Sequence, residues 1–96
     1  MLEETTHKSF ESLIGETLHL NTGDTGFQAD IESVNLFEQN PGQERQSFSV
    51  ILQAHDANNH GQQVYQISHP GLGKLDLFLV PIGPGEIGMR YEIIFN

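Results

Sequence analysis

The sequence predicts a mainly β fold, either a small antiparallel barrel or a two-sheet sandwich, with about six strands and one short N-terminal helix. Short segments of alternating apolar and polar residues recur along the chain, as expected of strands with one buried face. Clusters of Gly, Pro, Asn and Asp separate them and mark turns. No helical pattern alternates with the strands, which disfavours a parallel sheet. With 96 residues, the chain is predicted to form one domain spanning residues 1–96.

The first predicted element is a short helix over residues 5–15. Phe10, Leu13 and Ile14 have the spacing of one helical face, and Gly15 suits a left-handed terminator. A helix of this length is not stable alone. We therefore expect it to pack against one end of the β core.

Two strands are predicted next, over residues 16–20 and 27–37, joined by a turn at residues 21–26. The second strand alternates cleanly until its apolar set slips by one position. A one-residue slip moves side chains to the opposite face of a sheet unless a bulge absorbs it. We place that bulge near Ser33.

The middle of the chain predicts two more strands, over residues 46–54 and 62–69, with polar loops at residues 38–45 and 55–61. In the first of these strands the inward positions are Phe48, Val50, Leu52 and Ala54. The apolar members of the second are Val64, Tyr65 and Ile67.

A closing hairpin is predicted from strands over residues 75–80 and 89–95. The first strand is apolar on both faces after Asp76, which predicts that it is central or covered on both sides. Pro81 has no N–H to donate, so strand pairing is expected to end, or to reach an edge, at that residue.

Charge and composition argue against several classes of protein. The net charge is −9, with a balance of −7 in residues 1–48 and −2 in residues 49–96. Four basic residues cannot neutralise many phosphates, so neither nucleic-acid binding nor docking on anionic lipid is expected. The acids form either a solvated surface or a docking surface for a basic partner. The expected partners are proteins, either a second copy or another protein.

Targeting signals are not recognised in the sequence. No apolar run has the length of a membrane span, so no membrane insertion is expected, and the N-terminus lacks the pattern of a secretory signal. We expect synthesis in the cytosol, with the final location open. The absence of cysteine excludes disulfides and thiolate metal sites.

The closing hairpin carries a family resemblance. Its residues are His69-Pro70, Leu72-Gly73, the run 77–81, Gly83-Pro84, the run 88–92 and Phe95-Asn96. With weaker matches at Phe10, Leu13, Gly15-Glu16, Phe48 and Tyr65, the chain resembles a family of small bacterial proteins with a domain of unknown function. The resemblance implies an accessory role beside phage-tail-like or surface assemblies. It implies no catalytic residues.

Histidines are the first candidate site residues. His55 and His60 flank Asp56 in one loop, which suggests either an ion site or a polar turn stabilised by Asp and Asn. His69 precedes a proline, and it is either a general base or, as we favour, a residue bonded to a backbone carbonyl at a strand end.

Arg90 and its neighbour Tyr91 are further candidate contacts for a partner or ligand. Alternatively, Arg90 pairs across the sheet with Asp76 or another acid, which is the reading we favour. No catalytic constellation, metal site or cofactor motif is found, so no enzyme activity and no cofactor are expected.

Three functions follow from these patterns. The favoured one is a non-enzymatic structural or protein-binding module. The second is a small-ligand-binding barrel whose apolar pocket is lined by Phe10, Leu13, Tyr65, Phe78 and Met89. The last is a metal-dependent or acid–base hydrolase that uses His55, Asp56, His60 or His69.

Overall fold

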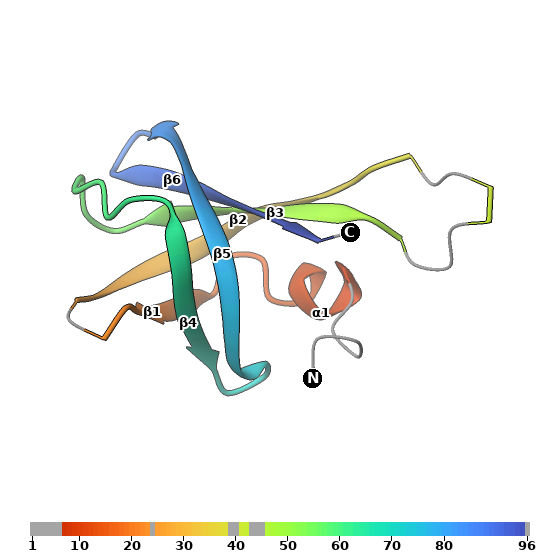
Figure 1. The fold of residues 1–96 in the computed structure, drawn as a ribbon, viewed down its shortest axis with the longest axis horizontal. Helices are drawn as coiled ribbons and strands as arrows, with labels where there is room; N and C mark the ends of the chain where they lie inside the picture. Colours follow the sequence, from red (N-terminus) through yellow and green to blue (C-terminus); the bar gives the residue numbers. More distant parts are fainter. Residues whose placement is uncertain (1–6, 24, 39–40, 43–45, 96) are drawn as a thin grey trace.

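A computed structural model describes residues 7–23, 25–38, 41–42 and 46–95, and it is a closed six-stranded antiparallel barrel with one short helix (Figure 1). This confirms the predicted fold class. The helix α1 spans His7–Glu11. The strands are β1 (Thr17–Asn21), β2 (Gly26–Leu36), β3 (Phe48–Ala54), β4 (Gln63–His69), β5 (Gly73–Pro84) and β6 (Met89–Phe95). Around the barrel their order is β1-β2-β3-β6-β5-β4.

Two long strands, β2 and β5, let the barrel close. Residues 26–30 of β2 pair with β1, and residues 29–36 pair with β3 apart from the bulge. In the same way, residues 73–79 of β5 pair with β4, and residues 80–84 pair with β6. The barrel is therefore two curved sheets that share their two longest strands.

Both long strands change register where they pass from one sheet to the other. In β2 the register shifts between Ile31 and Ser33, which confirms the bulge expected near Ser33. In β5 it shifts between Pro81 and Gly83. A bulge bends its strand and increases the local twist, which closure of a small barrel requires.

The expectation that pairing ends at Pro81 is wrong. Strand β5 runs on to Pro84, with Pro81 opposite Tyr91 and Pro84 opposite Met89. The bulge that follows Pro81 interrupts the regular ladder where this residue has no N–H to donate.

The barrel interior is a single apolar core. Its fully buried large side chains include Tyr65, Tyr91, Phe10, Leu18, Leu20, Ile31, Leu52, Ile67, Leu79 and Ile93. In β5 only alternate residues point inward: Leu75, Leu77 and Leu79 are buried, whereas Phe78 is 49% exposed. Strand β5 is therefore central, with a strand neighbour on each side, which confirms the first of the two predicted alternatives, but it is not covered on both faces.

The helix α1 is shorter than the predicted helix, and a turn follows it. Gly15 adopts a φ of 93° and donates its N–H to the carbonyl of Ile31 at 2.8 Å, which joins this turn to β2. Phe10 is fully buried, with its ring 6.2 Å from that of Phe48 and 5.3 Å from that of Phe95. The helix thus fills the core beside the end of β6 (Figure 1).

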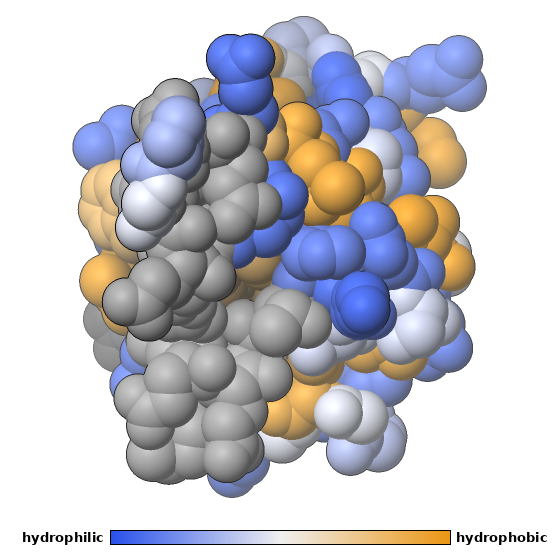
Figure 2. Space-filling model, turned by 90° about the vertical axis from the view of Figure 1, so that its right-hand side faces the viewer, coloured by the Kyte–Doolittle hydropathy of each residue, from blue (hydrophilic) through white to orange (hydrophobic). Residues whose placement is uncertain are grey.

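The surface at this end of the barrel mixes apolar and hydrophilic side chains (Figure 2). Leu36 and Phe37, at and just after the end of β2, are 51% and 41% exposed. Among the described residues, no helix is long and apolar enough to cross a membrane.

Candidate functional site

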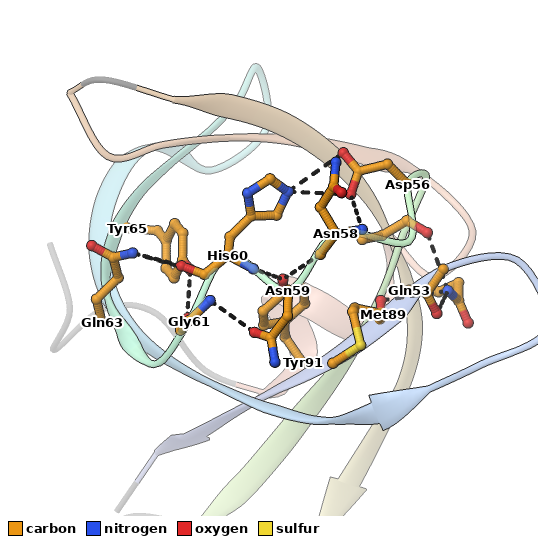
Figure 3. A network of polar contacts seen from close by, with 12 residues as sticks. Gln53, Asp56, Asn58, Asn59, His60, Gly61, Gln63, Tyr65, Met89 and Tyr91 are labelled. Carbon is orange, nitrogen blue, oxygen red and sulfur yellow. Dashed lines mark hydrogen bonds and ion pairs between the residues drawn. The ribbon is translucent and has the colours of Figure 1, made fainter.

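The loop between β3 and β4 covers one end of the barrel and holds two of the predicted site residues, His55 and His60, of which Figure 3 shows His60. We call this loop, residues 55–62, the cap, and the hydroxyl groups of two buried tyrosines hold it in place. The Tyr91 hydroxyl accepts a hydrogen bond from the backbone N–H of His60 at 3.0 Å and lies 3.4 Å from the carbonyl of Asn58. The Tyr65 hydroxyl donates to the carbonyl of Gly61 at 2.5 Å. Burial raises the pKa of both tyrosines above the ordinary value.

His60 is a structural part of this cap. Its ring stacks on that of Phe27, with centroids 4.0 Å apart and an interplanar angle of 9°. Its Nε2 lies 3.2 Å from Oδ1 of Asp56, whose carboxylate also accepts the N–H of Asn58 at 3.1 Å (Figure 3). The Asp and Asn side chains therefore organise a polar turn, as the second reading of this loop proposed.

The cap is also joined to the β5–β6 hairpin. Met89 donates its N–H to the carbonyl of Asp56 at 3.1 Å, and Gln53 donates to the carbonyl of Gly88 at 2.8 Å. A Cβ atom at Gly88 would lie 2.0 Å from the Asp56 carbonyl oxygen. Only glycine fits at this contact between the hairpin and the loop.

His55 points away from His60, toward β2. Its Nε2 donates to Oδ1 of Asp30 at 2.8 Å, and Thr17 donates to the same oxygen at 2.6 Å. The hydrogen bond from Thr17, followed by that from His55, lowers the pKa of Asp30 below its ordinary value. Across the described residues, no group of three or more His, Asp or Glu side chains is placed to hold a metal ion.

His69 lies at the turn between β4 and β5. Its Nε2 donates to Glu16 at 2.8 Å, while its Nδ1 accepts the N–H of Gly71 at 2.8 Å. The prediction that His69 bonds a backbone carbonyl is wrong, because its Nδ1 accepts a hydrogen bond from a backbone N–H instead. Both ring nitrogens are thus engaged in contacts that hold this turn against the start of β1.

Arg90 forms an ion pair with an acid, but that acid is not Asp76. Its Nε and terminal nitrogen bind the two carboxylate oxygens of Glu32 at 3.0 and 2.5 Å. This hydrogen bonding raises the pKa of Arg90 above its ordinary value. The pair borders a surface hollow of about 460 Å³ that Glu86 and Ile87 also line. The favoured interpretation, in which Arg90 pairs with Asp76 or another acid, is confirmed with Glu32 as that acid.

The five predicted contact residues therefore do not meet at one site. Tyr91 is buried, and the other four are each bonded to a different acid. The predicted apolar pocket is likewise not assembled as expected. Phe10, Tyr65 and Met89 belong to the packed core, but Phe78 lies on the outside of the barrel.

An exposed apolar strip on the outside of β4 and β5 was not predicted as a site. Val64, 55% exposed, and Phe78, 49% exposed, are directly opposite each other in the two strands. Val80, partly buried, follows two residues later on the same face of β5. We call Val64, Phe78 and Val80 the outer strip. In the sequence, this strip corresponds to the second apolar face of β5, from which we predicted burial rather than exposure.

Comparison with known proteins identifies one family. The model of a domain of unknown function, DUF6916, matches residues 5–95. No curated protein and no solved structure shows significant similarity to the chain.

Proposed function

The chain belongs to the DUF6916 family, and we propose that it is a non-enzymatic module that binds another protein through the outer strip. The observation that carries this proposal is the direct pairing of Val64 with Phe78 on the outside of a closed barrel. Each side chain is about half exposed, so together they offer apolar area that water contacts in the free protein. Contiguous exposed apolar area of this kind is typical of protein–protein interaction sites.

The contacts of His69 and of Arg90 support binding over catalysis. Each of these two groups is bonded to a carboxylate within the fold. An acid–base catalyst needs a nitrogen free to reach a substrate proton. In His69 both ring nitrogens are already bonded inside the chain.

The charges beside the outer strip favour a basic partner. Asp76 precedes Phe78 by two residues on the same face of β5, and Glu92 is directly opposite Val80. The whole chain carries a net charge of −9. Two copies that met at this strip would bring their acids together, and like charges at an interface oppose association. We therefore propose a different protein with an apolar centre and a basic rim.

The resemblance-based expectation of an accessory to a phage-tail-like or surface assembly is compatible with this proposal. This expectation stays a prediction, and the proposed binding through the outer strip does not depend on it.

The test compares two variants that remove exposed apolar side chains. The Val64→Ser/Phe78→Ser protein removes the centre of the outer strip, and Ile14→Ser removes a half-exposed side chain elsewhere. Proteins that co-purify from the native lysate are identified for each form at low and high salt. We expect a basic protein that the Ile14→Ser form retains, that the double variant loses, and that salt releases.

Two results would overturn the proposal. One is equal recovery of the same proteins by the unaltered chain and by the double variant. The other is a homodimer, seen by light scattering, that the double variant converts to a monomer. That result would assign the strip to a second copy.

A further inference from the structure

A hollow on the outside of the barrel crosses β1, β2, β4 and β5, and His69, considered above as a site residue, lines one part of it. It consists of two overlapping parts, of about 450 and 370 Å³, that share His19, Ser68 and Lys74. Hollows of this size lie in the range that holds small ligands. The proposed protein-binding function does not use it.

The floor of the hollow is a single row of polar residues across four adjacent strands. Gln28 is opposite His19, His19 is opposite Ser68, and Ser68 is opposite Lys74. Adjacent strands are about 4.8 Å apart, so Lys74 and His19 stand on either side of Ser68, within reach of one small ligand.

The charge of this hollow differs from that of the whole chain. The sequence has 13 acidic residues and 4 lysines and arginines, yet among the residues that the structure describes no aspartate or glutamate lines either part of the hollow. Lys74 has no ion pair within the described part of the chain. The nearest acid in the strand is Asp76, two residues along the same face of β5. A lysine without an ion pair, in a hollow whose described lining has no acid, favours a negatively charged ligand.

The row presents hydrogen-bond donors. The Lys74 ammonium has three donors and no acceptor, and the Ser68 hydroxyl can donate. The Gln28 amide nitrogen lies 3.3 Å from Nδ1 of His19, and an amide nitrogen only donates, so Nδ1 accepts. The ring proton of neutral His19 is therefore on Nε2, where it can donate to a ligand.

A second hollow that holds a basic residue, beside Arg90, shows the contrast. There the Arg90 guanidinium is bound through two hydrogen bonds to Glu32, and Glu86 lines the same space. An anion entering that hollow would compete with a carboxylate already in place. At Lys74 no such competitor is present among the described residues.

We propose that the row formed by His19, Ser68 and Lys74 binds the oxyanion of a small ligand, a carboxylate or a phosphate group. Lys74 supplies the charge and charge-assisted hydrogen bonds, which are stronger than neutral ones. Ser68 and His19 supply further donors and select an oxyanion over a spherical halide ion.

The experiment is a titration of the isotope-labelled full chain, followed by NMR, with inorganic phosphate, with succinate and with chloride at constant ionic strength. We expect saturable shifts with phosphate or succinate, confined to amides near His19, Ser68 and Lys74. Chloride should produce none. The stronger of the two oxyanions distinguishes a phosphate ligand from a carboxylate ligand.

Two variants that remove the same charge make the result specific. Lys74→Gln should weaken oxyanion binding about tenfold or more, as loss of a hydrogen bond to a charged group implies. Lys8→Gln, on helix α1, should bind like the unaltered chain. Ser68→Ala should weaken binding less than Lys74→Gln does, because it removes a neutral donor.

Three outcomes would overturn the proposal: no saturable shift with either oxyanion, equal weakening by Lys74→Gln and Lys8→Gln, or shifts spread over the whole surface. A further titration with glucose tests a neutral ligand. Glucose binding in the hollow that Lys74→Gln leaves unchanged would also overturn the proposal, in favour of a neutral polyhydroxylated ligand. None of these outcomes depends on the outer strip, so the protein-binding proposal is tested separately.

Discussion

The capped end of the barrel and its outer face use the same kinds of residue in opposite ways. At the cap, Phe27 and His60 stack and are held by buried tyrosines. On the outer face, Phe78 is half exposed and His19 borders a hollow. The cap therefore holds the fold together, whereas the outer face leaves the Phe78 and His19 side chains exposed. Residue type alone does not separate the two roles.

The largest expected contrast comes from deleting the same side chain in each region. Phe27→Ala removes a buried ring with aromatic contacts to His60, Tyr65 and Tyr91, and it should lower the free energy of unfolding by about 3–5 kcal/mol. Phe78→Ala removes an outer ring and should cost less than about 1 kcal/mol. Urea denaturation measures both. Similar losses would mean that the outer strip is also part of the core.

The next contrast tests the close contact between the cap and the hairpin. Gly88→Ala places a Cβ 2.0 Å from the Asp56 carbonyl oxygen, so the backbone must shift. We expect a loss of about 1–3 kcal/mol in the free energy of unfolding. The matched control is Gly26→Ala on the outer face, where the nearest atom lies at 3.5 Å. Unchanged thermal stability of Gly88→Ala would show that the loop moves easily.

Removing one hydroxyl from each region gives a further contrast. Tyr91→Phe leaves the His60 N–H without its acceptor, which should cost about 1–3 kcal/mol. Ser68→Ala on the outer face should change the free energy of unfolding by less than about 0.5 kcal/mol. Hydrogen exchange of the His60 amide reports the same event locally, and it should accelerate only in Tyr91→Phe.

The buried tyrosines also make stability depend on alkaline pH. Their pKa is raised in the folded chain, so unfolding releases protons above the ordinary value of 10.0. The contribution of these tyrosines to stability is therefore complete below that pH, and it is lost as the pH rises through their pKa in the folded chain. The free energy of unfolding should fall less steeply with rising pH in Tyr91→Phe than in the unaltered chain. An alkaline transition identical in the two proteins would contradict this assignment.

The smallest expected effect is at acid pH. The hydrogen bonds from Thr17 and His55 lower the pKa of Asp30 below 3.8, so this carboxylate stabilises the fold above that pH. The contribution is lost as the pH falls through the lowered pKa. Thr17→Val should bring the pKa of Asp30 back toward 3.8, as NMR titration of its carboxyl carbon can measure. An unchanged pKa would assign the shift to His55.

Much of the fold was predictable because it depends on local patterns. Alternation and turn residues located all six strands, and the slip in apolar phase located the bulge in β2. Pro81 misled the prediction because a missing donor was taken as the end of the strand, while a neighbouring bulge allows β5 to continue. The candidate site was less predictable. In the structure, each predicted contact residue is either bonded to an acid or buried.

The sequence by itself determined the strands, their turns and the acidic balance, because these depend on neighbouring residues and composition. Only the tertiary structure decided which apolar face of β5 is outside, which acid binds Arg90, and that Lys74 shares a row with His19. These depend on strand order and register, which are properties of the closed barrel. A shift of one residue in a single strand would turn its side chains to the opposite face.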